Sequence, residues 1–368
     1  MEGSLIKVLV ISTTNFGFDG ITNVILNYYR AMDKTDLKMD LMVPNQMKKD
    51  LQEEIEAYGG SVYCNPNRFR KPWRYLKTLT DIIRQNRYDI VHAHGNSCTL
   101  ALELYAAKKA GIKIRIPHSH NTTCKYQLLN RILRKSFDSL YTQAFSCGKK
   151  AGEWLYPKKE FEIINNGIEL NRYRYDQKLR NEYRAKYNLS DKMVIGHVGN
   201  FTDQKNHTYL IDIFLELYSK NKNYRLILVG DGVLRQEIEK KVIAMQLSEA
   251  VIFTGNINFV PQLMQAMDAI VMPSKYEGLP LTLVEAQASC LPCFISDQIS
   301  SEVAITNLIE FIPIVKPAKE WAHKIDRALP HNREKSANYV YHQIADAGYS
   351  IQENAKKLKE LYASYASG

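Results

Sequence analysis

Two glutamates in the last third of the chain have the spacing and surroundings of a ligand site. Glu277 and Glu285 belong to the segment 273–286, which follows a predicted strand at 269–272 and opens a predicted helix. Pro280 suits the first turn of that helix, where the N–H that proline lacks would have no helical partner. The free N–H groups of the turn and the helix macrodipole favour a bound diphosphate. Gly278 lets the backbone approach such a ligand closely.

The two carboxylates extend this predicted anion site on either side. One can accept hydrogen bonds from the hydroxyls of a sugar, and the other can accept them from a ribose diol. An anion binder between two diol binders is the layout that a nucleotide sugar requires. The alternative is structural, with Glu277 capping the helix and Glu285 on a solvated face. Apolar neighbours on both sides of Glu285 argue against that alternative.

Strands and helices alternate through both halves of the chain. In the first half, short apolar runs predict strands at 7–12, 38–43, 61–64, 90–93 and 113–117, and helical spacing predicts helices at 21–32, 48–58, 73–86, 100–110 and 126–142. The pattern restarts after an extended connection at 165–175, with strands at 193–198, 225–229, 251–254, 269–272 and 292–296. Strands joined by helices imply right-handed crossovers and parallel sheets covered on both faces.

We therefore expect the α/β class, with two Rossmann-like, doubly wound parallel-sheet domains facing a central cleft. The first domain should cover residues 1–170 and the second residues 171–345. Residues 346–368 should contain a lysine-rich amphipathic helix, for which packing back on the N-terminal domain is one option. Ligands bind such sheets beyond the carboxyl ends of the strands, so the polar residues that follow the strands are the candidates for a site.

Bulk properties indicate a globular protein with a basic first half. The 368 residues are 45% hydrophobic and 24% charged, as in ordinary soluble folds. No apolar run reaches the roughly 18 residues of a membrane span, and the N-terminus lacks a signal-peptide pattern. We therefore expect a cytoplasmic protein. Residues 1–170 hold 25 Lys and Arg against 17 Asp and Glu, and so carry +8 of the net charge of +10.

Basic residues of the first half form two groups: Arg68, Arg70, Lys71, Arg74 and Lys77, and then Arg131, Arg134 and Lys135. One interpretation is a solvated surface. The other is attraction to anionic lipid headgroups at the inner face of the cell membrane or to a pyrophosphate-bearing acceptor, at about 1 kcal/mol per basic residue. Nucleic acid is not expected, because recognition-helix, RRM and zinc-finger patterns are lacking.

The segment 273–286 resembles the E-x7-E motif of the family 4 retaining glycosyltransferases, which have the two-domain GT-B fold. Residues 276–292 with 302–306 resemble the branch that builds bacterial capsules and exopolysaccharides. Further matches span nearly the whole chain, among them Val91-His92-Ala93-His94-Gly95, His118-Ser119-His120-Asn121, Gly196-His197-Val198-Gly199 and Gln204-Lys205-Asn206-His207. The resemblance implies a glycosyltransferase whose N-terminal domain binds the acceptor and whose C-terminal domain binds the nucleotide sugar.

The resemblance also implies roles for residues of the second half. Glu277 contacts the donor sugar, Glu285 binds the ribose hydroxyls, and Lys205 neutralises charge that builds up on the leaving diphosphate. The diphosphate lies against the backbone of Gly278, Leu279, Pro280 and Leu281.

Other implied donor contacts carry open questions. Asn200 stands where many family members have Arg, and Asn cannot supply a positive charge. Either Lys205 acts with other groups such as the Gly20 backbone N–H, or the activity is weaker. Gly20 belongs to the loop 16–21, where Asp19 replaces the first glycine of the family's Gly-Gly. His118 and His120 end the strand at 113–117, and either of them fits the family's histidine near the donor sugar.

The implied reaction is retaining transfer by front-face attack. A UDP-sugar is the expected donor, and a glycan or lipid-linked oligosaccharide is the expected acceptor. We expect no metal and no cofactor, because enzymes of this type generally need none and the chain lacks the Asp-x-Asp of metal-dependent glycosyltransferases. Two alternatives stay open: a GT-B sugar-nucleotide epimerase, which would convert the donor without an acceptor, and a non-catalytic partner subunit of a glycosyltransferase.

Overall fold

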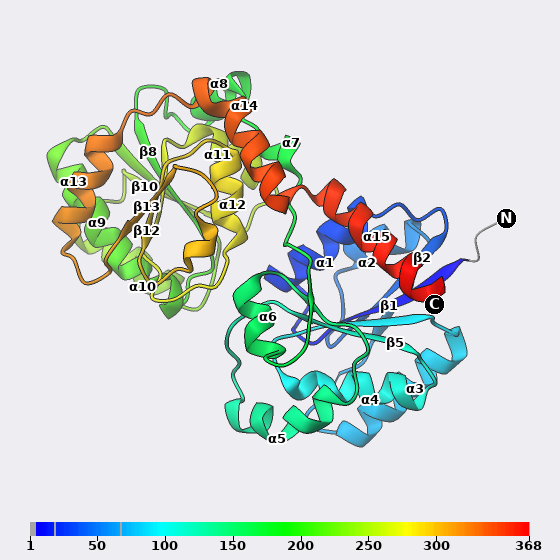
Figure 1. Cartoon of the computed structure of the whole chain (residues 1–368). Helices are drawn as coiled ribbons and strands as arrows, with labels where there is room; N and C mark the ends of the chain where they lie inside the picture. Colours follow the sequence, from blue (N-terminus) through cyan, green and yellow to red (C-terminus); the bar gives the residue numbers. More distant parts are fainter. Residues whose placement is uncertain (1–4, 18–19, 67, 368) are drawn as a thin grey trace. The chain divides into compact units, whose positions relative to one another are not determined.

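The computed structural model of the chain describes residues 5–17, 20–66 and 68–367. The chain forms two compact units (Figure 1). Unit 1 consists of Met1–Gly167 together with Ile351–Gly368, and unit 2 consists of Ile168–Ser350. The chain thus leaves unit 1 once, builds unit 2 and returns.

Unit 1 is built on a parallel sheet of seven strands in the order β3-β2-β1-β4-β5-β6-β7. Its strands are β1 (Ile6–Ser12), β2 (Leu37–Val43), β3 (Val62–Cys64), β4 (Ile90–His94), β5 (Ile114–Ser119), β6 (Phe145–Ser146) and β7 (Glu162–Ile163). Its α-helices are α1 (Gly20–Ala31), α2 (Lys49–Ala57), α3 (Pro72–Asn86), α4 (Ala101–Lys109), α5 (Gln127–Asp138), α6 (Lys149–Leu155) and α15 (Ile351–Ser367), and a 3-10 turn, η1 (Cys98–Leu100), precedes α4.

Helices cover both faces of this sheet. In Figure 1, α1 and α15 lie on one side of the strands, and α3, α4 and α5 lie on the other. The helix α15 packs against α1 and β1 of unit 1. The burial of Leu9 and Ile11 on β1 against Leu79 and Ile83 on α3 and Leu104 on α4 gives one of the hydrophobic cores. A sheet buried on both faces is the physical reason why β1 contains the continuous apolar run 8–11.

Unit 2 is built on a second parallel sheet of six strands in the order β10-β9-β8-β11-β12-β13. Its strands are β8 (Met193–Val198), β9 (Tyr224–Val229), β10 (Val251–Gly255), β11 (Ala269–Met272), β12 (Cys293–Ser296) and β13 (Ile309–Ile312). Its α-helices are α7 (Leu170–Tyr173), α8 (Gln177–Lys186), α9 (His207–Lys220), α10 (Arg235–Ala244), α11 (Val260–Ala266), α12 (Leu281–Ala288), α13 (Ala318–Ala328) and α14 (Arg333–Ile344), with short 3-10 turns η2 (Asp203–Lys205) and η3 (Ser301–Val303).

The expected fold class of two parallel-sheet α/β units is confirmed, and so are the ten predicted strands. The helix predicted at 126–142 is shorter than expected and ends at Asp138. Leu140 and Tyr141 are buried in the core of unit 1, so the chain turns inward instead of continuing along the surface. No helix in the described part of the chain is both long and apolar enough to cross a membrane.

Candidate active site

The predicted donor residues of unit 2 gather where β11 leads into α12. The connecting loop is fastened on both sides, since the Lys275 N–H donates to the Gln204 carbonyl at 2.8 Å and the Ser300 N–H donates to the Glu277 carbonyl at 3.2 Å. Pro280 is the N-cap residue of α12, and its side chain makes no capping hydrogen bond. The loop therefore presents the start of α12 in a fixed position with N–H groups that suit an anion.

Lys205 and Glu277 form an ion pair with 2.7 Å between Nζ and Oε1. Their side chains are only 16% and 10% exposed. Lys205 ends η2, and Asn206, which follows in the left-handed conformation, donates its side-chain N–H to the Pro273 carbonyl at 3.0 Å. Two residues that the sequence predicted for the same site thus meet across 72 positions of chain, and each compensates the charge of the other.

Two glycines make room for the Lys205 side chain. A Cβ at Gly199 would lie 3.1 Å from Cε of Lys205, so the aliphatic part of the lysine passes directly over this backbone. Gly230 has φ +129°, and a Cβ there would lie 2.3 Å from the Gly199 carbonyl oxygen, so only glycine fits. The ends of β8 and β9 are therefore shaped to carry the ammonium group at the carboxyl edge of the sheet.

The buried histidines near Lys205 were matched to family motifs but given no role. Burial lowers the pKa of His197 to about 4 and that of His207 to about 2, and the Lys205 charge adds to both shifts. His197 Nδ1 lies 2.8 Å from the Val271 carbonyl oxygen, and the His207 ring stacks on Phe201 with 4.0 Å between centroids. Both rings are neutral at physiological pH, so they support the lysine without adding charge.

Glu285 lies one position into the second turn of α12 and bonds to Tyr173. Burial raises the pKa of Glu285, while the hydrogen bond from Tyr173 and the nearby Arg172 charge lower it. Tyr173 ends α7, the first helix of unit 2, and burial raises the pKa of its hydroxyl. Tyr173 was not predicted from the sequence, because a tyrosine more than 100 positions away from its partner gives no local signal.

The other predicted donor residues of unit 2 lie on the same loop or on a neighbouring one. Gly278, Leu279 and Pro280 are part of the half-buried loop before α12, and Leu281 is the first residue of that helix. Asn200 follows β8 by two positions and its side chain is exposed. Asn200 thus lies on the loop between β8 and η2, five positions before Lys205, and carries no charge there.

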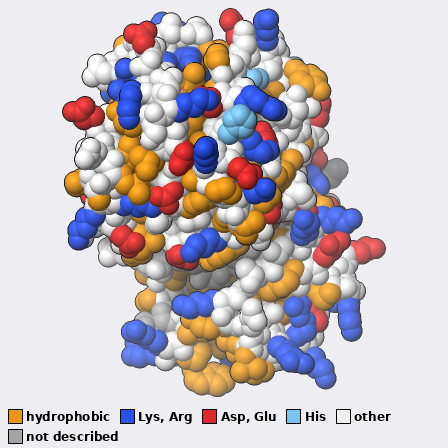
Figure 2. Space-filling view, turned by 90° about the vertical axis from the view of Figure 1, so that its left-hand side faces the viewer, with side chains coloured by type: hydrophobic (Ala, Val, Ile, Leu, Met, Phe, Trp, Pro, Cys, Tyr) orange, Lys and Arg blue, Asp and Glu red, His pale blue; other side chains and the backbone are white. Residues whose placement is uncertain are grey.

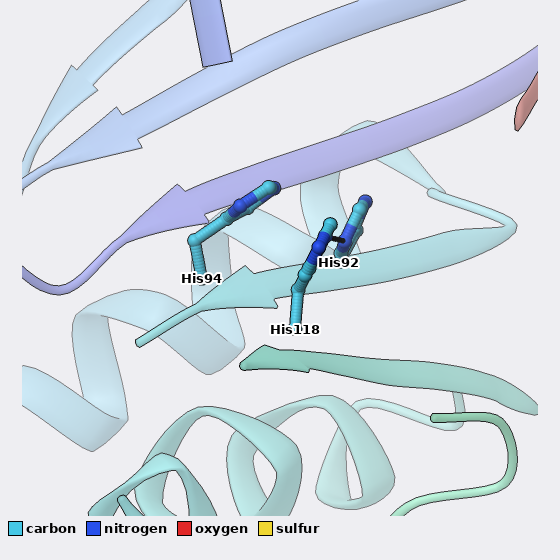
Figure 3. A group of neighbouring side chains, drawn as sticks. All are labelled: His92, His94 and His118. Atoms are coloured by element: carbon cyan, nitrogen blue, oxygen red, sulfur yellow. Dashed lines mark hydrogen bonds between the residues drawn. The ribbon is translucent and has the colours of Figure 1, made fainter. Parts of the chain in front are cut away.

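In unit 1, four histidines form a stack at the carboxyl ends of β4 and β5. His94 of β4 and His118 of β5 are partners in the parallel register. Ring centroids are 4.8 Å apart for this pair, 4.4 Å for His118 and His120, and 4.3 Å for His92 and His94. Figure 3 shows the rings of His92 and His118 side by side with the hydrogen bond between them. The sequence predicted His118 and His120 as candidates for the histidine near the donor sugar, and it matched His92 and His94 to a family motif without giving them a role.

Hydrogen bonds order the stack from one end. The Tyr362 hydroxyl of α15 lies 2.6 Å from His92 Nδ1, and His92 Nε2 lies 3.1 Å from His118 Nδ1. His94 Nδ1 lies 2.8 Å from His120 Nε2. One consistent assignment has Tyr362 donating to His92 and His92 donating to His118, which leaves the His118 proton on Nε2.

All four histidines favour the neutral form. Burial lowers the pKa of His92 to about 3 and that of His120 to about 4. It also lowers the pKa of His94 and that of His118 well below the ordinary value. Neighbouring imidazoles add to the downward shifts of His92, His94 and His118. His118 is fully buried, whereas His120 is half-buried. His120 is therefore the member of the stack that a ligand reaches most easily.

The nitrogens of His92, His94 and His118 lie within 4.8 Å of one another, which is close enough for a metal site. A bound metal lies in the plane of each imidazole ring. The planes of His92 and His118 are within 3° of parallel, and those of His94 and His118 are within 30°. Lone pairs of stacked rings run side by side, so this arrangement suits a hydrogen-bonded relay better than convergence on one ion.

Gly20 is the first residue of α1, at the carboxyl edge of the sheet of unit 1. A Cβ added at this position would meet nothing within 4 Å. The described surroundings therefore do not explain why glycine stands there. Phe18 and Asp19 of the predicted glycine-rich loop lie outside the described residues.

Comparison with known proteins agrees with this geometry. The family described as "Glycosyltransferase Family 4" matches residues 18–172, and the one described as "Glycosyl transferases group 1" matches residues 180–344. EpsF of Bacillus subtilis, which is named as a glycosyltransferase, is 33% identical over 98% of this chain and 97% of its own length. The chain belongs to glycosyltransferase family 4.

Other relatives of the chain are less similar in sequence. An Escherichia coli enzyme named UDP-Gal:alpha-D-GlcNAc-diphosphoundecaprenol alpha-1,3-galactosyltransferase is 22% identical over 93% of each chain. CapH, a capsular polysaccharide biosynthesis glycosyltransferase of Staphylococcus aureus, is 23% identical over 86% of this chain and 87% of its own length. The family 4 assignment and the polysaccharide-building relatives that the sequence predicted are thus confirmed.

Solved structures identify the fold of this family 4 member as GT-B. The crystal structure of Anabaena Alr3699/HepE in complex with UDP superposes with a TM-score of 0.78, covering 98% of this chain and 100% of that chain at 16% identity. At that identity the likeness concerns the fold alone. The roles of the individual site residues stay predictions.

Proposed function

We propose that this glycosyltransferase moves a sugar from a UDP-sugar to a hydroxyl group of a lipid-linked glycan, with retention of configuration, in the synthesis of a capsular or extracellular polysaccharide. The observation that supports this most is the ion pair of Lys205 and Glu277 beside the start of α12, which also carries Glu285. A cation, a helix start and two carboxylates together offer what the diphosphate, the sugar and the ribose of a donor require.

The ion pair also suggests how donor binding prepares the site. Without the donor, the ammonium of Lys205 and the carboxylate of Glu277 neutralise each other at 2.7 Å. A diphosphate at the start of α12 competes for the lysine because it carries more negative charge than one carboxylate. Glu277 is then released to accept hydrogen bonds from the donor sugar. The same exchange places the positive charge where negative charge develops as the nucleotide leaves.

The proposed reaction transfers the sugar in a single front-face step. The bond between the anomeric carbon and the diphosphate oxygen breaks, and the acceptor hydroxyl oxygen bonds to the anomeric carbon on the same face. The hydroxyl proton passes to the departing diphosphate. The chain's own groups bind and orient the reactants, and Lys205 compensates charge on the leaving group. No metal is proposed for this step.

The relatives support the choice of donor and acceptor. The Escherichia coli relative is named for a UDP-galactose donor and a diphosphoundecaprenol-linked acceptor, and the Anabaena structure contains UDP. An acceptor of this kind lies in a membrane, so we propose that the protein works at the inner membrane surface. The neutral histidine stack, with His120 as its most accessible member, suits the uncharged hydroxyl groups of a sugar better than a phosphate.

A thermal-shift screen against UDP-, GDP- and ADP-sugars tests the choice of donor. A ligand present at 100 times its dissociation constant stabilises the native state by about 2.7 kcal/mol. We expect a shift with UDP-sugars alone, and we expect Glu285→Ala to abolish it. A shift with another nucleotide class would replace UDP in the proposal, and the absence of any shift would favour a non-catalytic partner subunit.

Product analysis tests the proposed reaction. NMR of the product should show the anomeric configuration of the donor, and an inverted product would overturn the retaining mechanism. Donor conversion without acceptor would point to an epimerase. Activity should be the same with and without EDTA, and loss of activity in EDTA that Mg²⁺ or Mn²⁺ restores would overturn the metal-free reaction.

A further inference from the structure

Exposed apolar side chains gather on one part of unit 1. The described part of the chain has fourteen large hydrophobic side chains that are exposed, and five of them belong to the segment 69–73 or to the segment 126–132. Trp73 is 83% exposed, Leu128 73% and Ile132 66%, while Phe69 and Tyr126 are about half exposed. Large apolar groups at such exposure mark an interaction surface when they lie together.

The two segments lie together because their aromatic rings touch. The ring centroids of Phe69 and Tyr126 are 5.5 Å apart. Trp73 follows Phe69 by four positions and lies at the start of α3. Leu128 and Ile132 are four positions apart in α5 and therefore share one side of that helix. We call these five residues and the exposed basic residues beside them the basic-apolar surface.

Buried polar contacts hold the basic-apolar surface in place. Arg68 is buried, and its guanidinium donates to both carboxylate oxygens of Glu103 at 2.6 Å and to the Thr99 carbonyl at 2.7 Å. The side chain of Asn130 in α5 accepts a bond from the Cys98 N–H at 2.7 Å. The loop before α3 and the helix α5 are thus both fastened to the same region around η1.

The charge of this surface has one sign. The segments 65–80 and 121–137 contain no Asp or Glu. Their exposed basic residues are Arg70, Lys71, Arg74, Lys77, Lys125, Arg131 and Lys135. The space-filling view shows basic and hydrophobic side chains side by side at its lower end, whereas both signs of charge mix over its upper part (Figure 2).

We infer that the basic-apolar surface docks on an anionic lipid bilayer. Lys and Arg attract the phosphates of lipid headgroups, and Trp, Tyr, Leu and Ile between them reach the boundary of headgroups and acyl chains. A protein partner of matching shape would have to supply acidic groups around an apolar centre, whereas an anionic bilayer supplies both over any area. The purpose of such docking rests on the proposed lipid-linked acceptor, but the docking itself does not require turnover.

Trp73 provides a direct probe of docking. The other tryptophans, Trp154 and Trp321, are half-buried and buried. With vesicles of phosphatidylcholine and phosphatidylglycerol, we expect the emission of Trp73 to shift to shorter wavelength and to be quenched by brominated acyl chains. Trp73→Phe should remove this response, and flotation of the same variant should still show binding through the remaining side chains.

Matched variants distinguish docking through this surface from nonspecific attraction of a basic protein to anionic vesicles. Arg131→Gln/Lys135→Gln should weaken the partition onto anionic vesicles by about 30-fold, because each basic residue contributes about 1 kcal/mol. Leu128→Ser/Ile132→Ser should weaken it as well. The control Lys240→Gln/Lys319→Gln removes two exposed lysines of unit 2 and should leave it unchanged. Equal binding of all variants, or binding of the wild type no stronger to anionic than to phosphatidylcholine vesicles, would overturn the inference.

Failure of the docking inference and failure of the proposed function give different results. Vesicle binding is measured without any sugar nucleotide, and donor binding is measured by thermal shift without vesicles. A protein that binds anionic vesicles but no UDP-sugar keeps the docking surface and loses the proposed donor. A protein that binds a UDP-sugar but no vesicles loses the docking surface, and the acidic protein partner then becomes the occupant to seek.

Discussion

The two groups of candidate site residues use opposite electrostatics. In unit 2, Lys205 and Glu277 carry full charges and are held 2.7 Å apart. In unit 1, burial keeps the histidines around His118 neutral. A charged pair can exchange partners when a charged ligand arrives, whereas a neutral hydrogen-bonded stack can orient an uncharged one. This difference fits the proposed roles, with the diphosphate at unit 2 and hydroxyl groups at unit 1.

Of the substitutions that test this comparison, Lys205→Ala should have the largest effect on activity. It removes the cation of unit 2 and leaves the nearly buried Glu277 without its partner. We expect kcat to fall by about 10²–10³-fold, as when one preorganised stabilising group is lost. Steady-state transfer assays measure this. Lys275→Ala, which removes a more exposed lysine paired with Asp203, is the matched control and should change kcat less than threefold or so. Equal losses in both variants would show that the position of Lys205 has no special role.

Acidification should reduce the folding stability of the protein through the histidine stack. The pKa of His92 is about 3 in the folded chain and about 6.5 in the unfolded one, so between these values the unfolded state binds more protons. Stability therefore falls as pH drops below about 6.5. For His92 the loss from pH 7 to pH 5 is on the order of 2 kcal/mol by linkage.

Chemical denaturation of the wild type and of His92→Gln at both pH values measures this loss. His197 and His207 of unit 2 should destabilise both proteins at low pH in the same direction. His92→Gln should therefore keep the part of the acid-induced loss of stability that comes from the other histidines and lack the part that comes from His92. Identical pH dependence of the two proteins would mean that His92 titrates normally in the folded chain.

Tyr173→Phe tests how the carboxylate of Glu285 is kept charged. Burial raises the pKa of Glu285, and the hydrogen bond from Tyr173 opposes this. Without the hydroxyl the pKa should rise further, and the acid limb of the kcat/KM profile should move to higher pH. A loss of about 1 kcal/mol in stability should accompany it. Tyr175→Phe, two positions away, is the control. An unmoved acid limb in Tyr173→Phe would mean that this limb does not report the titration of Glu285 or that the Tyr173 hydroxyl does not affect it.

Asn200→Arg should have the smallest effect. The asparagine lies on the exposed loop between β8 and Lys205, where many family members have a positive charge. An added exposed cation contributes well under 1 kcal/mol, so we expect kcat/KM for the donor to rise by about threefold. The gain should shrink at high salt. A loss of activity instead would mean that the uncharged side chain has a role of its own.

Local patterns in the sequence predicted the framework of the site well. Strands such as β1 and β11 contain continuous apolar runs, at 8–11 and 269–272, and the start of α12 carries its own signals in Pro280 and in the spacing of Glu277 and Glu285. The ion pair between Lys205 and Glu277 joins two residues that were each predicted singly. Residues that follow parallel strands meet at one edge of the sheet, so this contact could be expected once both were placed.

What the sequence did not predict depends on contacts between distant or very short segments. Tyr173 and Tyr362 act through partners far along the chain, and no local pattern marks a tyrosine that will be buried against a histidine. The strands β6 and β7 have two residues each, which is too short for any periodicity. The helices α13 and α14 were not predicted from the sequence. They follow the second sheet, where alternation with strands no longer guides the prediction.

The return of α15 to unit 1 has a consequence for how the chain folds during synthesis. Tyr362 bonds to His92 across 270 positions, and all of unit 2 is made between them. During synthesis the strands of unit 1 leave the ribosome first, and α15, the last helix that packs on them, follows only after unit 2 has been made. Unit 2 can meanwhile fold as an uninterrupted segment. The apolar face of unit 1 that α15 covers stays exposed during that interval. We therefore expect the nascent chain to bind a chaperone.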